Sequence, residues 1–447
     1  MYFIYSLLLT LAFLILLPRF VLDAIRHGKY AAGFWQRTGS VPRVAFDAAR
    51  PVVWIHCVSV GETMAARPVV AELRARHPHF RIVVSTTTLT GQRTARAQFG
   101  DVAAHVIYFP FDWTWSVRRA LRRINPSVVL IMETELWANF MRECHRRATP
   151  VALVNGRLSP RSMRGYGRIK FFMRRVVDGL SVAVMQSDAD THRIATLGLD
   201  PSRIRVAGNV KFDVAETAHD RRDLCERFRL DDTRPLIVAA STHHTEEQIM
   251  LEAFNSLLAD SPLAPSKVQR PRLLIAPRHP ERFAEIAALI QKHTPSCSRR
   301  SALPAPHDAT CDIILLDSIG ELAQVYHHAA IVFVGGSIAP HGGHNILEPA
   351  AAGACVITGA HTANFAHIIT AFREADAIVQ LPPSSESDAT HSLIDAMRDL
   401  LANATRRTQL TAHAHRVITL NRGATARTLD FLATLFKEEG GRRKDEG

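Results

Sequence analysis

The sequence contains few cysteines, and none of them stands in a closely spaced pair. The six cysteines are scattered with no CxxC motif, which argues against a cysteine-based zinc site and against a disulfide framework. A reducing compartment is therefore the simpler interpretation. The chain also has no evident internal repeat or low-complexity tract. The cysteines are Cys57, Cys144, Cys225, Cys297, Cys311 and Cys355.

Acidic residues are fewer than basic ones. Asp and Glu total 42 against 54 Lys and Arg, which leaves a formal net charge of +12. This excess predicts attraction to an acidic partner, and nucleic acid, an anionic membrane or a phosphorylated substrate would each satisfy it. A hydrophobic content of 47% and a charged content of 21% are typical of a globular protein rather than a disordered one.

The N-terminal stretch Met1–Leu17 lacks any charged residue. Its length is about the lower limit for a helix that spans a bilayer. It is not a typical cleavable signal, because no positively charged leader precedes it and no small-residue cleavage site follows. Basic residues come directly after it, so we expect a single anchor with the bulk of the protein on the cytoplasmic face. Residues 20–37 could lie along the headgroups. A buried N-terminal helix is the alternative. The basic residues are Arg19, Arg26, Lys29 and Arg37.

A length of 447 residues predicts two domains. From Pro51 onward, short apolar runs alternate with helical patterns, which favours βαβ units and parallel sheets. A polar interval at 215–234 separates two such series, and ligands are then expected beyond the carboxyl ends of the strands. The predicted strands are 52–57, 81–85, 106–109, 127–132, 151–154 and 181–185 in the first series, and 236–240, 273–276, 313–316, 330–334, 355–357 and 377–381 in the second.

A glycine-rich stretch, Val332–Gly353, begins inside one of these predicted strands and continues beyond it. It passes through Gly335, Gly336 and Ser337 and enters a predicted helix at Asn345. Glycines at a strand-to-helix junction allow close backbone approach to a ligand, and a helix start offers unpaired N–H groups to a phosphate. A nucleotide site is one interpretation, and a tight βα turn without a ligand is the other.

Carboxylates follow two strands of the first series. Glu62 comes after the first strand, where partial desolvation could raise its pKa and make it a general base. A first-turn glutamate that answers the helix dipole is the alternative. Glu133 and Glu135 follow the fourth strand and could orient a sugar hydroxyl or cap the next helix. Lys211 lies near the end of this half, and we expect its side chain to reach across toward the second domain.

In the second half, polar groups again follow the strands. Arg278 suits a phosphate oxygen because its guanidinium is a planar fork of donors. Residues 319–321 could offer backbone N–H groups, and Asn345 and Glu348 could hold base or ribose hydroxyls. Four histidines invite a metal interpretation, but their spacing lacks an accompanying carboxylate motif. They are His243, His244, His341 and His344.

Seven motifs, in order along nearly the whole chain, resemble those of the bacterial 3-deoxy-D-manno-octulosonic acid (Kdo) transferases. The resemblance implies a GT-B glycosyltransferase with two Rossmann-like domains that face a central cleft, behind an N-terminal membrane-anchor helix. It implies transfer of Kdo from CMP-Kdo to a lipid A precursor (lipid IVA), with release of CMP, at the cytoplasmic face of the inner membrane. The motifs are VSVGET (58–63), METELW (132–137), VNGRLSPRS (154–162), GNVKFD (208–213), ASTHHTEE (240–247), APRHPERF (276–283) and FVGGSIAPHGGHNILEPAAAG (333–353).

The resemblance also implies the roles of individual residues. Glu62 matches the family's catalytic base, in an inverting transfer that needs neither a metal nor a cofactor. The segments matching the CMP contacts are Pro277, Arg278, Ile319, Gly320, Glu321, Asn345, Ile346, Leu347 and Glu348. Further possible contacts are Lys211, Ser241, Glu133, Glu135, Gly336 and Gly343. The departures from the family pattern are Thr63 after the glutamate, Ala138 and Ile346, and none of them removes a charged or donor group.

The expected domains follow from the same resemblance. Residues 1–18 form the anchor, 19–50 an interfacial connection, 51–220 an acceptor-binding domain, 221–430 a CMP-Kdo-binding domain and 431–447 a charged tail. The partners are then the donor, the phosphorylated lipid acceptor and the anionic membrane, and no nucleic acid. A nucleotide-sugar epimerase and a non-enzymatic, membrane-tethered binder of acidic ligands are the rival classes. Candidate contacts to the acceptor phosphates are Arg161, Arg164, Arg168 and Lys170.

Overall fold

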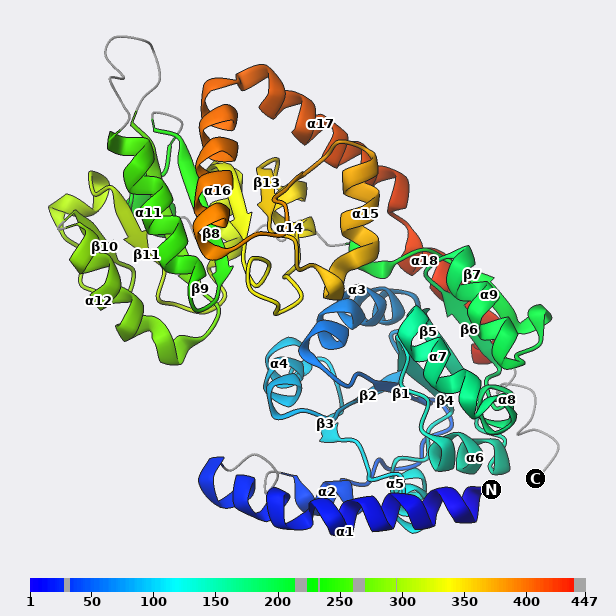
Figure 1. Cartoon of the computed structure of the whole chain (residues 1–447). Helices are drawn as coiled ribbons and strands as arrows, with labels where there is room; N and C mark the ends of the chain where they lie inside the picture. The colour runs from blue at the N-terminus through cyan, green and yellow to red at the C-terminus, as the bar shows by residue number, and fades with distance from the viewer. Residues whose placement is uncertain (28–32, 214–222, 232–233, 260–269, 295, 438–447) are drawn as a thin grey trace. The chain divides into compact units, whose positions relative to one another are not determined.

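The computed structural model describes residues 1–27, 33–213, 223–231, 234–259, 270–294 and 296–437 (Figure 1). The chain divides into two compact units. The first unit comprises 1–213 together with 421–447, and the second comprises 214–420. Lys29, the polar interval at 215–222 and the tail beyond residue 437 lie outside the described residues.

The first unit is built on a seven-stranded parallel sheet. Its strand order is β3-β2-β1-β4-β5-β6-β7, which has the reversal of direction beside β1 that defines a doubly wound fold. The strands are β1 (Val52–His56), β2 (Arg81–Thr86), β3 (His105–Tyr108), β4 (Val128–Met132), β5 (Val151–Gly156), β6 (Val182–Met185) and β7 (Ile204–Val206).

Helices cover both faces of this sheet. Side chains of α3, α4 and α18 share one apolar core with it, and those of α5, α6, α8 and α9 share the other. The helices are α1 (Tyr2–His27), α2 (Phe34–Arg37), α3 (Val60–Arg76), α4 (Leu89–Phe99), α5 (Thr114–Ile124), α6 (Ala138–Arg146), α7 (Pro160–Arg168), α8 (Lys170–Val177), α9 (Asp188–Leu197) and α18 (Ala424–Lys437).

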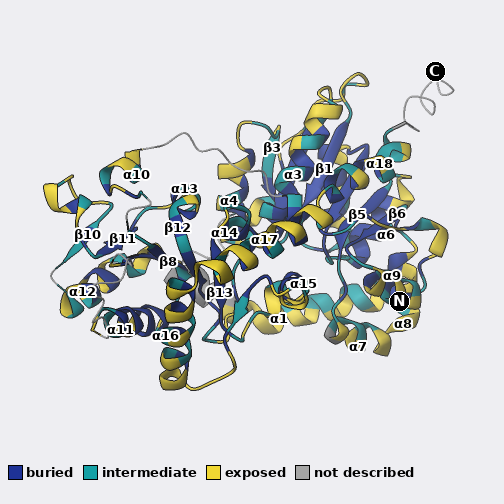
Figure 2. Ribbon diagram, turned by 90° about the horizontal axis from the view of Figure 1, so that it is seen from above, coloured by how far each residue is buried: buried dark blue, intermediate teal, exposed yellow. Residues whose placement is uncertain are grey.

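The central strands of this sheet are apolar because both of their faces are covered. Every residue of β1 is buried, and Trp54 pairs in register with Val83 of β2 and Val129 of β4. Successive side chains of a strand point to opposite faces, so a continuous apolar run is what a sheet between two helix layers requires. Figure 2 shows this buried centre in dark blue, with β1 and β5 inside it.

The second unit repeats this architecture with the strand order β10-β11-β9-β8-β12-β13-β14, again all parallel. Its strands are β8 (Leu236–Thr242), β9 (Arg272–Pro277), β10 (Cys297–Arg299), β11 (Ile313–Leu315), β12 (Ala329–Val334), β13 (Cys355–Thr358) and β14 (Val379–Gln380). Its helices are α10 (Asp223–Arg227), α11 (Glu246–Ala259), α12 (Phe283–His293), α13 (Leu322–Val325), α14 (Leu347–Ala351), α15 (Ala366–Glu374), α16 (Glu386–Ala402) and α17 (Ala404–Asn421).

Two parallel, Rossmann-like units confirm the predicted fold class. The structure adds β7 and β10, two three-residue strands that the apolar pattern did not mark. It also differs at the C-terminal end, where α18 packs on the first unit although we predicted a second domain that reached 430 and a tail from 431. Asp213 holds the start of α18 on the first unit, because its carboxylate accepts hydrogen bonds from the backbone N–H groups of Gly423 and Thr425, each at 2.6 Å.

The apolar helix at the N-terminus is α1. By length and composition its segment Tyr2–Arg19 could cross a membrane. The helix extends beyond the predicted anchor, residues 1–18, and continues past Pro18 to His27. Arg37, which we placed in the interfacial segment, is buried; its guanidinium donates to the carbonyl of Thr87 at 2.5 Å and lies over the ring of Tyr108. It is therefore not available to headgroups.

Candidate functional site

Glu62 lies in the first turn of α3, directly beyond the carboxyl end of β1. One carboxylate oxygen accepts from the backbone N–H of Val58 at 2.7 Å and the other lies 3.3 Å from the hydroxyl of Ser59. Glu62 thus accepts from residues that precede α3, as a first-turn glutamate can. Glu62 is only 9% exposed.

Burial raises the pKa of Glu62 to about 8. The hydrogen bond from Val58 acts in the opposite direction, and the nearby charges of Glu133 and Glu135 raise the pKa further. A carboxyl group with such a pKa is a usable proton acceptor near neutral pH, which an ordinary surface glutamate is not. Glu62 therefore combines local contacts at the start of α3 with a raised pKa.

Glu133 and Lys211 form an ion pair at the same edge of the sheet. Glu133 directly follows β4 in the left-handed region at φ 60°, and its Oε1 lies 2.6 Å from Nζ of Lys211. The two residues belong to motifs 78 positions apart in the sequence, and the structure places them together. Glu135 is partly buried, and burial raises its pKa.

In the second unit, Glu246 fills the turn that the glycine-rich stretch forms after β12. Its carboxylate accepts from the backbone N–H groups of Gly336 at 2.7 Å, Ser337 at 2.9 Å and Ile338 at 3.0 Å. It also accepts from the N–H of His243 at 2.9 Å, and it is fully buried. These amides therefore already have an anionic partner within the protein. The sequence predicted close backbone approach to a ligand at these glycines, and the structure shows an internal carboxylate bonded to the backbone there.

The tight geometry of this turn explains its glycines. A Cβ at Gly335 would lie 2.7 Å from both Oε2 of Glu246 and the carbonyl oxygen of Ser241, and Gly336 has φ +66°. Gly343 also has a positive φ, and its N–H donates to the carbonyl of Gly336 at 2.7 Å. Both glycine pairs thus shape one folded loop.

Histidines surround Gly336. Nε2 of His243 lies 2.8 Å from Nε2 of His344, so one ring donates and the other accepts. Burial lowers the pKa of His243 to about 4 and that of His344 to about 3, which keeps this pair neutral near pH 7. The ring of His341 stacks on His243 at 4.3 Å, whereas His244 is exposed near Glu285. Within the described residues, no group of three or more potential ligands is arranged to hold a metal ion.

Arg278 follows β9 and is exposed. Its backbone N–H donates to the carbonyl of Thr242 at 2.9 Å, which fixes the chain beside β8, and its charge acts on His243 and His344. An exposed guanidinium beside two neutral imidazoles is suited to an anion. The structure thus places Arg278, Gly336 and the histidines at the carboxyl ends of neighbouring strands.

Other predicted residues have internal roles. Glu321 forms an ion pair with Arg300 at 2.8 Å, and this hydrogen-bonded contact lowers its pKa. Asn345 contacts the start of α14, where its Oδ1 accepts from the N–H of Leu347 and its Nδ2 donates to Glu348, both at 3.1 Å. The helix begins at Leu347, two residues later than we predicted, and has only five residues.

Five further predicted residues differ in exposure. Three are buried and could contribute only backbone groups to a ligand, and two are more accessible. Pro277, Ile346 and Leu347 are buried. Ile319 is 79% exposed, and Gly320 has φ +87° with open space around it. This segment follows β11, which is separated from β8 by β9.

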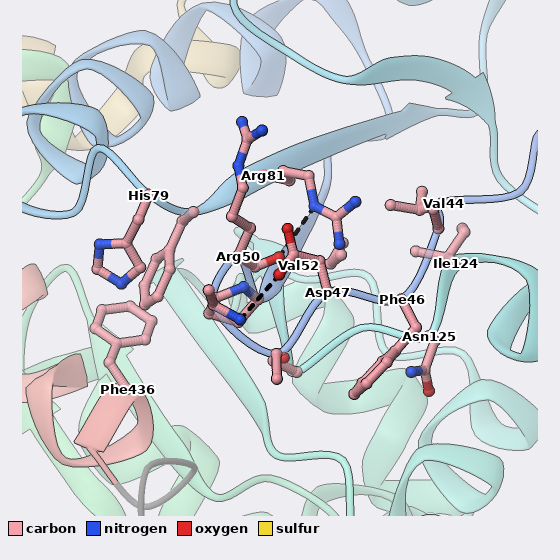
Figure 3. Close-up of a pocket in the computed structure, with 16 residues that line it drawn as sticks. Val44, Phe46, Asp47, Arg50, Val52, His79, Arg81, Ile124, Asn125 and Phe436 are labelled. Carbon is pink, nitrogen blue, oxygen red and sulfur yellow. Dashed lines mark hydrogen bonds between the residues drawn. The ribbon is translucent and has the colours of Figure 1, made fainter.

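A pocket of about 210 Å³ lies at the opposite edge of the first sheet, where β1 and β2 begin (Figure 3). Arg50 and Arg81 line it, with Nε of Arg81 donating to the carbonyl of Arg50 at 3.0 Å. His79 and Phe436 lie side by side at one end. Because Glu62 lies at the carboxyl ends of the strands, this pocket is separate from the candidate site.

Comparison with known proteins identifies the family. A family model described as 3-deoxy-D-manno-octulosonic-acid transferase (kdotransferase) matches residues 32–214. The 3-deoxy-D-manno-octulosonic acid transferase of Haemophilus influenzae is 37% identical over 85% of this chain and 86% of its own length. The chain belongs to the Kdo transferase family. The Bordetella pertussis relative of the same name is 34% identical over 95% of this chain and 97% of its own length.

Solved structures show that the Kdo transferase chain has a widely shared fold. A glycosyltransferase from Rickettsia africae aligns with a TM-score of 0.56 at 13% identity, over 87% of this chain and 99% of its own. A UDP-GlcNAc 2-epimerase from Neisseria meningitidis aligns with a TM-score of 0.58 at 12% identity, over 86% of this chain and all of its own. At such identities the likeness concerns the fold alone, so it does not favour the epimerase alternative.

Sequence reasoning missed Glu246 and the contact between His243 and His344. Both belong to quoted motifs, but the partners of Glu246 lie about 90 positions away and those of His243 about 100. The available signal was a strand-end motif that carries two consecutive glutamates at a helix start, and both of them are buried.

Proposed function

We propose that this Kdo transferase moves Kdo from CMP-Kdo to a phosphorylated lipid A precursor, lipid IVA, and releases CMP. Family membership supports the sugar, and the environment of Glu62 carries the proposal for the chemistry. Glu62 is a buried carboxylate at the carboxyl end of β1 whose pKa is raised to about 8. The first unit would then hold the acceptor and the second the donor, at the cytoplasmic face of the inner membrane.

The chemical step begins with proton transfer to Glu62. Its carboxylate takes the proton of an acceptor hydroxyl, and the oxygen attacks the anomeric carbon of Kdo. The bond from that carbon to the phosphate oxygen breaks, and CMP leaves with the bonding electron pair. Attack opposite the leaving group inverts the configuration. General base catalysis of this kind is worth roughly 10²- to 10⁴-fold in rate.

The donor would be held at the carboxyl ends of β8, β9 and β12. Arg278 would pair with the phosphate of CMP, and the charge that develops on CMP as it leaves would be stabilised by this guanidinium. The exposed backbone at Gly320 could meet the nucleotide. Glu348, which lies beside Asn345 at the start of α14, favours neutral sugar hydroxyls over phosphate.

One experiment separates this function from the two rival classes. The purified full-length protein is incubated with CMP-Kdo, generated in place, and tetraacylated lipid A precursor, and the products are identified by mass. We expect the acceptor to gain whole Kdo units with equimolar CMP. Epimerised nucleotide sugar without acceptor modification would indicate the epimerase class. Binding of CMP-Kdo with no product at all would indicate the non-enzymatic class. Either result would contradict the proposal.

A further inference from the structure

One face of α1 is docked against the first unit over most of its apolar length (Figure 1). The partly buried residues recur at intervals of three and one, which places them on a single stripe of the helix. The other described side chains of α1 are exposed. The members of the stripe are Tyr2, Tyr5, Ser6, Leu9, Thr10 and Phe13.

Three polar side chains of this stripe, those of Tyr5, Ser6 and Thr10, have hydrogen-bond partners elsewhere in the first unit. The hydroxyl of Tyr5 donates to Oδ2 of Asp112 at 2.9 Å. The hydroxyl of Ser6 accepts from Nδ2 of Asn139 at 3.0 Å. Asp112 and Asn139 are themselves buried. A helix that left the unit to cross a bilayer would lose these partners, and hydrocarbon offers no replacement.

The middle and the end of the stripe are held in the same way. Oγ1 of Thr10 accepts from Nε1 of Trp113 at 3.1 Å, and the ring of Phe13 packs against Trp113 at 5.0 Å. At the other end, the rings of Tyr2 and Tyr5 pack against Phe172 at 5.7 and 5.6 Å. The contacts therefore fix the direction of the helix along the unit, not only one point of it.

The exposed face of α1 is apolar and continues onto neighbouring elements. Phe3 is 78% exposed and Ile15 is 76% exposed. Exposed Trp115 stacks on Trp113 beside Phe13, and exposed Phe171 adjoins Phe172. We refer to this surface as the apolar platform. Its members are Phe3, Ile4, Leu7, Leu8, Leu11, Leu14, Ile15, Leu16, Leu17, Trp115, Ile169 and Phe171.

Basic side chains adjoin the platform. On α7 and α8 they are exposed on both sides of Ile169 and Phe171. Anionic headgroups would complement them, whereas a second copy covering the same surface would bring two sets of like charges together. This arrangement favours a lipid surface as the partner. The basic residues are Arg164, Arg168, Lys170, Arg174 and Arg175.

We infer that α1 does not span the membrane but lies in the plane of an anionic bilayer interface, with the apolar platform in one leaflet. A helix with one face docked on protein and the other apolar enters the boundary between headgroups and acyl chains by about 5–10 Å. This inference replaces the single-pass arrangement that hydropathy predicts. It rests on the proposed function only in assuming that the protein works at a membrane.

Depth measurement tests the inference without measuring catalysis. Nitroxides are placed one at a time at Phe3, Leu7, Leu11 and Leu14 of the full-length protein, through a non-cysteine handle, in phosphatidylethanolamine–phosphatidylglycerol vesicles. These positions share one helix face. Power saturation should give all four labels the same shallow depth. Depths that rise to the bilayer centre and fall again along the helix would overturn the inference.

Two further results belong to the same experiment. A label at Glu386, which is exposed in the second unit, should report water and serves as the control. Dipolar broadening without lipid contact at the α1 labels would show a second copy on the platform and would also overturn the inference. The distance between labels at Leu7 and Lys170 should be unchanged between detergent and vesicles. Combined Ser6→Val and Thr10→Val replacement should broaden the distribution of that distance, because the hydrogen bonds that dock α1 are lost.

Discussion

Glu62 combines a capping contact with an unfavourable charge. Its carboxylate accepts from the N–H of Val58, which stabilises the start of α3, yet burial raises its pKa to about 8 from an ordinary value of 4.5. A carboxyl group with a raised pKa contributes most to stability below pH 4.5, and this contribution is lost as the pH rises through 8. The charged form that a general base needs is thus the form that the fold tolerates least.

We therefore expect Glu62→Gln to become relatively more stable as the pH rises. Each pKa unit corresponds to about 1.4 kcal/mol, so the unfolding free energy of the variant should gain roughly 2–4 kcal/mol on the unaltered protein between pH 5 and pH 9. Urea unfolding at several pH values measures this gain. Glu72→Gln, at a more exposed glutamate of the same helix, is the control for a Glu-to-Gln replacement in α3. A constant difference for Glu62→Gln would contradict the raised pKa.

A second prediction at the scale of single residues concerns the ion pair of Lys211 and Glu133. Lys211→Met should destabilise the first unit by about 2–3 kcal/mol, because it leaves a mostly buried carboxylate without its partner. Adding Glu133→Gln should recover much of the loss. Thermal unfolding of the two single variants and the double variant checks this coupling. Additive losses would show that the pair contributes nothing as a pair.

Among the elements, the loop after β12 depends on one helix. Glu246, the first residue of α11, accepts from four backbone N–H groups, three of them in that loop. Because these donors would lose an acceptor, Glu246→Gln should weaken CMP binding by about tenfold or more, as measured by calorimetry. Glu247→Gln is the matched control, since its carboxylate is equally buried but pairs with Arg282. Equal effects of the two variants on CMP binding would contradict a specific role for the loop after β12.

Strand positions could be predicted from the sequence because central parallel strands are buried on both faces. The runs at β1, β4, β8 and β12 are continuous and apolar, and every one of them forms a strand. The edge strand β10 (Cys297–Arg299) carries a serine and an arginine, so no apolar run marks it. The role of the loop at Gly335 was not predictable either, because local sequence does not reveal that its amides already bind Glu246.

At the scale of the whole molecule, part of the net charge of +12 can be assigned to one surface. Exposed basic residues adjoin the apolar platform, and each basic side chain near an anionic surface contributes about 1 kcal/mol. Combined replacement of Arg164, Arg168 and Lys170 by Gln should weaken binding to anionic vesicles by about 100-fold and leave the KM for CMP-Kdo unchanged. The matched control replaces three exposed basic residues of the second unit, Lys292, Arg373 and Arg416. Equal losses in both triple variants would attribute binding to net charge alone.

Domain content could be predicted from the sequence only in part. The alternation of strands and helices predicted two sheets, but the return of α18 to the first unit depends on Asp213, whose partners lie about 210 positions later. The motifs predicted where Glu62 stands, since it follows a buried strand. Its raised pKa depends on burial and on the charges of Glu133 and Glu135, which lie about 70 positions later and which no local pattern reports.

The most direct test of the central claim is the pH dependence of Kdo transfer by the unaltered protein and by Glu62→Gln, with CMP binding measured on the same samples. The account predicts that kcat/KM for the acceptor rises with pH to a plateau above about pH 8, as Glu62 loses its proton. The variant should lose roughly 10²- to 10⁴-fold in rate at every pH and still bind CMP. A variant that transfers Kdo at the unaltered rate with the same pH profile would contradict the account.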